Sequence, residues 1–233
     1  MEKIICALWK AEGEARDDFS ARLLADLPAK LTAAGARHIR LNIEDQVSDA
    51  GAALRQSRGE SQHHATLQFW VPTAYAPLRA EVDAALHAAC DHWAAWLVVE
   101  STIIPNSDHP PILGQRTAGW AQLAFLTLPA GMAHEDWRRI WQNDHTKVAI
   151  ETQANFEYVQ NLILRPLTDN APPYVAIVEE CFPESALTDP FVFFDAVGNK
   201  AKFDTNLGEM MESCGRFITP GTIDVIPTSQ YNF

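Results

Sequence analysis

The sequence predicts an α+β fold in which two βαββαβ repeats close a single barrel. Three observations favour this fold: a weak internal repeat, strand patterns that are apolar on both faces, and helical segments alternating with strands. The chain has 233 residues, of which 47% are hydrophobic and 21% are charged. A chain of this size can bury a core as one large domain or as two of about 100 residues each.

The internal repeat emerges when the chain is shifted against itself by about 118 residues. Gly13 then matches Gly131, and the apolar pattern of the two segments agrees without a gap. A second stretch aligns at a slightly smaller shift and matches Pro72 to Pro183. We infer a structural duplication.

The duplication divides the chain into a first, diverged repeat at 1–104 and a second repeat at 118–233. Between them lies the segment PNSDHPPILGQR, which is rich in proline and polar residues. Such a composition is typical of a connection, so residues 105–117 are the predicted linker. Residues 45–62 are predicted to form a polar loop.

Each repeat is predicted to run strand, helix, strand, strand, helix, strand. The first repeat has predicted strands at 3–10, 37–43, 63–71 and 94–101, and helices at 17–33 and 75–91. The second has predicted strands at 120–128, 155–164, 174–182 and 216–226, and helices at 133–152 and 200–214. This order is ferredoxin-like, with helices on one face of a four-stranded sheet. Because several strands are apolar on both faces, we expect the two sheets to face each other around a small cavity.

Charge and composition exclude several classes of protein. The formal net charge is −12, which disfavours binding to nucleic acid or to an anionic membrane surface. No segment approaches the roughly 18 apolar residues of a transmembrane helix, and the N-terminus lacks signal-peptide features. The four cysteines form no CxxC pair and are predicted to be buried reduced thiols. We therefore expect a cytoplasmic protein.

Motifs for metals and nucleotides are absent from the sequence. His87 and His92 are five residues apart rather than the four that align two ligands on a helix, and there is no HExxH motif. The sequence contains no GxGxxG fingerprint, no P-loop lysine motif and no GxSxG elbow. We expect no metal site and no organic cofactor.

Two segments resemble a known family. The helix WRRIWQNDHTKVA with the following strand YVQN, and the later segment FDTNLGEMMESCGRFI, resemble EthD-type members of the dimeric α/β-barrel superfamily. The resemblance is stronger in the second repeat, and the two repeats together extend from about residue 3 to residue 218. It implies a barrel that takes up small, apolar, often aromatic molecules. Relatives include cofactor-free monooxygenases, polyketide cyclases, decarboxylases, dehydratases and isomerases, and some bind haem; the fold alone does not choose among them.

The helix of the second repeat carries a stripe of three residues, Trp137, Trp141 and His145, spaced i, i+4 and i+8. Both tryptophans match apolar residues in the first repeat, so they are first of all packing residues. His145 matches Leu27, and an imidazole at an apolar position needs a partner. It is either a core histidine with a hydrogen-bond partner or an acid/base group that faces a cavity.

Alternation along the second strand of each repeat suggests further site residues. His38 and Arg40 share one face, and Tyr158 and Gln160 share the matching face in the second repeat. If the opposite faces lie under the helices, these four side chains point into the barrel. The alternative for His38 and Arg40 is a solvated strand face.

The third strands have a similar ambiguity. His64, Gln68 and Trp70 share a face, and Glu179 matches Gln68 in the second repeat. Trp70 could form the platform of a cavity, with Gln68 or Glu179 as its polar anchor. The same side chains could instead be exposed.

The favoured hypothesis is an EthD-like, cofactor-free enzyme of a degradative or tailoring pathway. It would act as a lyase, dehydratase, isomerase or cyclase on a small apolar, aromatic or polyketide-like molecule. His145 would move a proton, and Tyr158 would donate a hydrogen bond to a carbonyl or phenolate. A polar group would be held by Arg40 or Gln160, and the apolar wall would be formed by Trp70, Trp137 and Trp141. A non-catalytic binding protein and a cofactor-free or haem-binding oxygenase remain alternatives, and a homodimer is left open.

Overall fold

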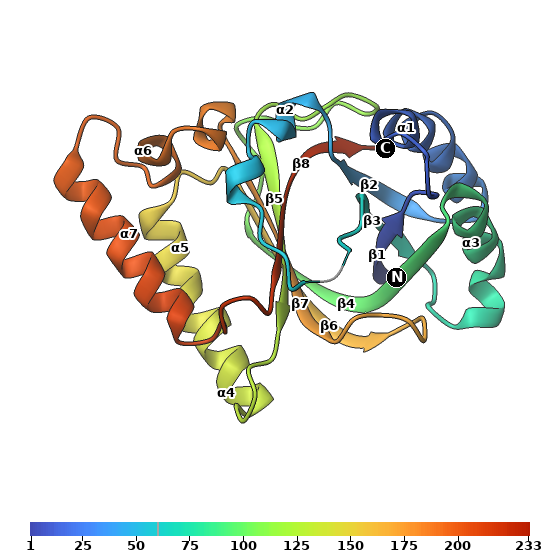
Figure 1. Cartoon of the computed structure of the whole chain (residues 1–233). Helices are drawn as coiled ribbons and strands as arrows, with labels where there is room; N and C mark the ends of the chain where they lie inside the picture. The colour runs from blue at the N-terminus through green and yellow to red at the C-terminus, as the bar shows by residue number, and fades with distance from the viewer. Residues whose placement is uncertain (60) are drawn as a thin grey trace.

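The computed structural model describes residues 1–59 and 61–233. In this part of the chain the strands are β1 (Glu2–Trp9), β2 (Arg37–Ile43), β3 (Ala65–Val71), β4 (His92–Ile104), β5 (Trp120–Thr127), β6 (Glu157–Pro166), β7 (Tyr174–Phe182) and β8 (Asp224–Asn232). They form one closed barrel in the order β1-β3-β2-β8-β5-β7-β6-β4 (Figure 1). Every neighbouring pair is antiparallel.

The pairing has the symmetry that a duplication produces. Strands β1 to β4 form one four-stranded sheet with the order β4-β1-β3-β2, and strands β5 to β8 form a second with the equivalent order β8-β5-β7-β6. Two pairings, β2 with β8 and β4 with β6, join the sheets into a barrel. The predicted α+β fold with a closed barrel made by one chain is confirmed.

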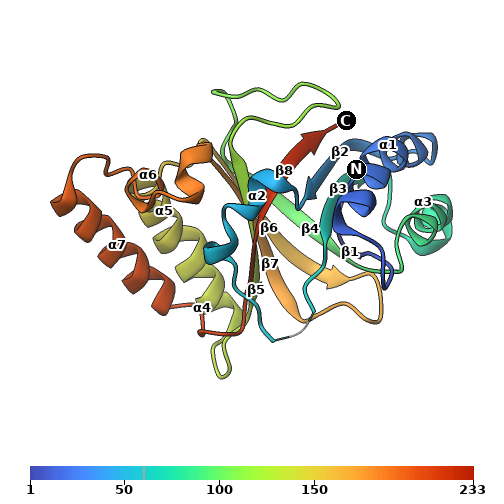
Figure 2. The ribbon, with the colours of Figure 1, turned by 45° about the horizontal axis from the view of Figure 1, so that its top comes forward.

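Helices cover the outer face of each sheet, on opposite sides of the barrel (Figures 1 and 2). The first sheet carries α1 (Arg16–Ala33) and α3 (Ala76–Ala89). The second carries α4 (His134–Arg139), the π-helical segment η2 (Ile140–His145), α5 (Thr146–Thr152) and α7 (Lys200–Gly215). Short helices lie in the connections: α2 (Gln46–Asp49), η1 (Ala52–Leu54), η3 (Glu184–Leu187) and α6 (Pro190–Phe193).

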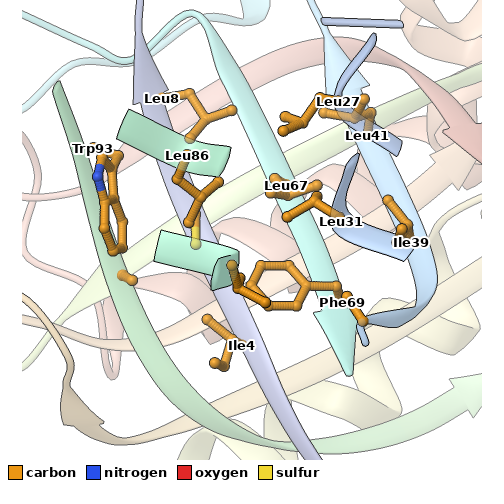
Figure 3. Close-up of a cluster of buried hydrophobic side chains, with 14 of the residues drawn as sticks. Ile4, Leu8, Leu27, Leu31, Ile39, Leu41, Leu67, Phe69, Leu86 and Trp93 are labelled. Carbon is orange, nitrogen blue, oxygen red and sulfur yellow. The ribbon is translucent and has the colours of Figure 1, made fainter. Parts of the chain in front are cut away.

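Apolar periodicity explains the first helix layer. The alternating residues Ile39 and Leu41 of β2 point outward and meet Leu27 and Leu31 of α1 in one buried cluster (Figure 3). Helix α1 ends before Gly35, whose φ of +93° lies in the left-handed region that glycine adopts without a steric penalty. This is the end that the sequence predicts.

The barrel interior is largely filled. One cluster of apolar side chains fills part of it, including Ile5, Trp96, Phe125, Ile177 and Ile226. Polar side chains from most strands fill another part. The cavity expected between the sheets is therefore restricted to the polar part, where a space of about 380 Å³ remains.

Two predicted elements differ from the structure. The predicted strand 216–226 is wrong over most of its length, because β8 begins only at Asp224. The preceding residues form a turn in which Pro220 cannot donate a backbone hydrogen bond and Gly221 has a φ of +77°. The predicted helix 133–152 exists but is interrupted by the π-helical segment η2.

Three further observations concern the loop 45–62, the cysteines and the helices. The predicted polar loop 45–62 contains α2 and η1, and Gln56 forms an isolated bridge with Val225 of β8. All four cysteines are free, with Cys6 and Cys181 buried. No helix among the described residues has the length and apolar character to span a membrane.

Candidate functional site

Tyr158 and Gln160 do not face the barrel interior, so their predicted orientation is wrong. Tyr158 is buried in the cluster between the second sheet and its helices, together with Trp141. The Gln160 amide lies on the same side and donates to the Tyr158 hydroxyl oxygen at 2.8 Å. Their neighbours Glu157 and Val159 point inward instead. Because both faces of this part of β6 are buried, alternation alone could not show which face was inside.

The two tryptophans of the helix stripe are packing residues, as their match to the first repeat suggests. Trp137 is fully buried, and its indole N–H donates to the backbone carbonyl of Phe217 at 3.1 Å. Trp141 packs against it with ring centroids 5.0 Å apart. They differ in one respect, because Trp141 also lines a cavity whereas Trp137 lies behind it.

A cavity of about 380 Å³ lies between the outer face of the second sheet and the helical segments η2 and α7. Its walls are mostly apolar, with side chains of Trp141, Met210, Phe217, Ile223 and Val225. Few groups in it can take part in proton transfer: His145, Tyr158, Glu180 and the thiol of Cys214. An apolar cavity of this size with a few convergent polar groups is typical of a small-molecule site.

Glu180 provides the carboxyl group of this cavity. In the strand register it lies directly opposite Tyr158 of β6 on one side and Gln122 of β5 on the other. The three side chains thus form a row on the helix-facing side of the sheet. Gln122 donates to one carboxyl oxygen of Glu180 at 3.2 Å, and Asn155 donates to the other at 3.1 Å.

Burial perturbs the acidity of each group. Desolvation raises the pKa of Glu180 to about 7, although the two amide hydrogen bonds lower it in part. Burial, and then the neighbouring Glu180 charge, raise the pKa of Tyr158, so its hydroxyl stays protonated. At neutral pH the cavity therefore contains a carboxyl group that both holds and releases a proton, beside a neutral phenol.

His145 is half-buried at the edge of the cavity. Its Nδ1 lies 3.0 Å from the hydroxyl of Ser213, and its ring packs on Phe217 at 4.6 Å between centroids. Burial, and secondarily the charge of Arg216, lower the pKa of His145 to about 4. The imidazole is neutral at pH 7. It has the hydrogen-bond partner expected of a core histidine and it also lines the cavity, while its acid/base role stays a prediction.

The π-helical segment positions this wall of the cavity. Thr146, directly after it, donates its hydroxyl to the Trp141 carbonyl at 3.1 Å and accepts from Gln160 at 2.7 Å. Gln160 also holds the oxygen of Tyr158. The chain of contacts connects the helix to the Tyr158 hydroxyl, and single π-helical turns are frequent at functional sites.

The remaining predicted residues lie elsewhere. His38, Arg40, Gln68 and Trp70 meet around the second cavity, at the polar part of the barrel interior. The prediction that Gln68 and Glu179 are equivalent inward-facing residues agrees with the structure, since the Gln68 amide donates to Glu179 at 2.8 Å.

The prediction that His64 shares a face with Gln68 is wrong, because regular alternation begins only with β3 at Ala65. Its Nδ1 accepts from the backbone of Lys10, and its ring meets Phe19 of α1. The single cavity that the sequence suggested is thus two cavities on opposite faces of β6.

Glu180 was not among the predicted site residues. The stretch VEEC presents two adjacent carboxylates, of which Glu179 points inward and Glu180 outward. The signal that could have found it is its alignment opposite Tyr158, but this depends on a register that sequence alone does not specify. Among the described residues, no three His, Cys, Asp or Glu side chains gather as a group that could hold a metal ion.

A closed barrel of two ferredoxin-like halves with helices outside defines the dimeric α/β-barrel fold, formed by one chain. No family model matches the sequence, and no curated protein matches it. Among solved structures, an anthrone oxidase-like protein is similar over 99% of this chain and 93% of its own, with a TM-score of 0.57 and 9% identity. A chlorite dismutase-like protein covers 98% of this chain and 95% of its own, with a TM-score of 0.46 and 11% identity. The first likeness supports the fold, and the resemblance to EthD-type proteins stays a prediction.

Proposed function

We propose that this protein is an enzyme that converts a small, apolar, ring-containing ketone or phenol by proton transfer, with Glu180 as the general acid and base. One observation carries the proposal. A carboxyl group with a pKa of about 7 lies in the wall of an apolar cavity and is held by two neutral amides instead of a cation. A group whose pKa is near the working pH is the most effective proton donor and acceptor.

The apolar walls orient the substrate. Its ring system would pack between Trp141, Met210 and Phe217, which leaves its polar atom to face the sheet. Gln160 donates to the Tyr158 oxygen, so the Tyr158 hydroxyl proton can be donated to a substrate carbonyl. As a C–H bond beside this carbonyl breaks, negative charge would develop on the oxygen, where the phenol stabilises it.

Glu180 would take this proton in its ionised form and return it to another atom in its protonated form. Such a transfer is common to isomerisation, dehydration and cyclisation, which are the reaction classes the EthD-like hypothesis names. General acid–base catalysis of this kind contributes about 10²- to 10⁴-fold. His145, neutral at pH 7, would act as a hydrogen-bonding group in the cavity wall, which revises its expected role as the main proton carrier.

The haem-binding alternative does not fit the residues of this cavity. A haem brings two propionates, and the described lining residues include no Lys or Arg to pair with them. A buried carboxyl group without a cationic partner also lies in this lining, which disfavours a dianionic cofactor there.

Proton exchange provides a test that does not need the natural substrate. Anthrone is a suitable probe, because a structural neighbour is described as anthrone oxidase-like and its methylene protons are acidic. We expect the wild-type protein to accelerate exchange of these protons with deuterium, followed by NMR. Glu180→Gln, which keeps the shape and one acceptor oxygen for the neighbouring amides, should lower the rate about 100-fold or more.

The matched control is Glu209→Gln, on the exposed side of α7, which should exchange like the wild type. Binding of anthrone without accelerated exchange, equal in all three proteins, would identify a carrier of hydrophobic molecules and overturn the enzymatic proposal. Equal acceleration by wild type and Glu180→Gln would also overturn it.

A further inference from the structure

A second cavity opens at the polar part of the barrel interior, on the other face of β6 from the Glu180 site. Its volume is about 380 Å³, and it shares no lining residue with the first cavity. Polar groups from both halves of the chain line it: Lys3, Arg40, Gln68, Glu100 and Glu157. The proposed function makes no use of this space.

Most polar groups around this cavity are paired with one another. The Arg40 guanidinium donates to Glu179 at 2.7 Å, to Glu157 at 2.9 Å and to Asn232 at 2.9 Å. Lys3 pairs with Glu100 at 2.5 Å across the β1–β4 sheet. These contacts hold the walls in place and make the polar part of the barrel rigid.

Gln68 is the exception. Its amide nitrogen donates to Glu179 at 2.8 Å and to Asn42 at 3.2 Å, so the amide orientation is determined by these contacts. Its oxygen, Oε1, is buried without a hydrogen-bond partner, and the residue is only 2% exposed. A buried acceptor without a partner is destabilising, and because Gln68 lines the cavity, a small shift of its side chain would let a bound donor satisfy it.

The charges favour a donor that is also a cation. Three carboxylates, from Glu100, Glu157 and Glu179, face two cationic side chains, from Lys3 and Arg40. An additional positive charge would therefore be stabilised.

Apolar groups stand at the outer side of the same cavity. The indole of Trp70 is half-buried, and Leu113 in the connection between β4 and β5 is 73% exposed. The rim also carries His38, whose φ of +50° coincides with the bulge where the β2–β3 register shifts. Bulges re-aim side chains and are frequent beside functional sites.

We propose that this cavity is a second binding site, specific for a small primary amine with a flat apolar body. The ammonium group donates to Gln68 Oε1 beside the carboxylates of Glu100 and Glu157. The apolar body packs on Trp70 and covers Leu113. A cation near the face of the indole adds a favourable cation–π interaction.

Calorimetric titration of the full chain with three probes of similar size tests this site. The probes are 2-phenylethylamine, the neutral 2-phenylethanol and the anionic 3-phenylpropionate, all at pH 7. We expect the amine to bind at least tenfold more tightly than the alcohol and the anion not to bind. Trp70→Leu should weaken amine binding about tenfold, the range of a desolvated cation–π contact.

Matched variants separate this site from other indoles and from the first cavity. Trp9→Leu removes a half-buried indole of β1 that lies outside both cavities and should leave the amine affinity unchanged. Leu113→Ser, on an exposed loop where folding is not at risk, should weaken it about threefold. Glu180→Gln should not change it.

Equal affinity for amine and alcohol would overturn the proposal, as would the absence of amine binding at millimolar concentration. Loss of amine binding in Glu180→Gln but not in Trp70→Leu or Leu113→Ser would place the amine in the first cavity and would also overturn it. None of these outcomes depends on catalysis, so the test is independent of the proposed function.

Discussion

Tyr158 and Glu180 lie directly opposite each other on β6 and β7, on the face of the sheet that the second helix layer covers. The closed barrel fixes this register, because β6 is held between β4 and β7 and cannot slide. A phenol that stays protonated and a carboxyl group that titrates near neutrality are thereby placed side by side in an apolar cavity. The proposed chemistry depends on this pair.

Tyr158→Phe should slow the anthrone exchange by about 10²-fold, because the donor for the developing oxyanion is lost. Folding should persist with a loss of about 1–3 kcal/mol, since Gln160 loses its hydrogen bond to Tyr158 but keeps the one to Thr146 at 2.7 Å. The measurement is the exchange rate at saturating probe, with the melting temperature as the control. An unchanged rate in a folded variant would contradict the role of the phenol.

The raised pKa of Glu180 makes stability depend on pH. Its pKa is about 7 in the folded protein and near its ordinary value of 4.5 in the unfolded chain. Between these values the folded state binds the proton and the unfolded state does not, so stability falls as pH rises from about 4.5 to 7. The full effect is about 3 kcal/mol.

Glu180→Gln should remove this dependence and stabilise the protein above pH 7, where the wild type carries a buried charge. Urea unfolding of both proteins at pH 5 and pH 8 measures the difference. A similar pH dependence in the variant and the wild type would show that Glu180 ionises normally.

Over nearly the same pH range, two histidines should act in the opposite direction: His145, and the buried His63, whose ring meets Phe125. Burial lowers the pKa of His145 to about 4 and that of His63 to about 3, against 6.5 in the unfolded chain. The unfolded state therefore binds protons first, and stability falls as pH decreases from 6.5 towards 4. His145→Gln and His63→Gln should each reduce this loss of stability at acidic pH, as measured by urea unfolding. Only His145→Gln should also change the exchange rate, because His63 lies outside the cavity.

Trp141 and Trp137 provide a matched pair of substitutions. Trp141→Phe should enlarge the cavity and raise the KM for anthrone, because the side chain forms part of its wall. Trp137→Phe should lower stability by about 1–3 kcal/mol through the lost hydrogen bond to the Phe217 carbonyl, with little change in KM. Steady-state kinetics and melting curves of both variants distinguish the two roles. Equal KM changes would show that Trp141 has no special contact with the ligand.

Arg40 should be a structural residue of the barrel. Its guanidinium bridges Glu157 and Glu179, and Glu179 is fully buried. Burial alone would raise the pKa of Glu179, but the Arg40 charge, together with the hydrogen bonds from Gln230, Asn42 and Arg40, holds the pKa below its usual range. Arg40→Met leaves both carboxylates without their cation and should cost about 3–5 kcal/mol in urea unfolding. A loss below about 1 kcal/mol would contradict this account.

Much of the fold could be predicted from the sequence because its signals are local. The apolar periodicity of residues 16–33 and the glycine after them defined α1. The repeat then indicated that the second half would follow the same order. The strand expected at 216–226 failed because its apolar residues, such as Phe217 and Ile218, pack under the helices from a turn instead of from a strand.

The site was harder to predict because it depends on which face of a strand is inside. Residues Glu157 to Asn161 of β6 are all buried, so neither face is marked by exposure. His145, Tyr158 and Trp141 line one cavity, but it lies on the helix side of the sheet and not inside the barrel as predicted. Glu180 could not be distinguished from Glu179 without the register. Here tertiary pairing, not local pattern, decides which face of the sheet each neighbouring residue occupies.

The most direct test of the central claim is the pKa of the Glu180 side chain in the folded protein. Carbon-13 NMR of glutamate-labelled protein, with Glu180→Gln to assign the resonance, follows this carboxyl group from pH 4 to pH 9. We predict a titration midpoint near pH 7. A midpoint near the ordinary glutamate value of about 4.3 would contradict the account, because the group would then be a permanently ionised carboxylate.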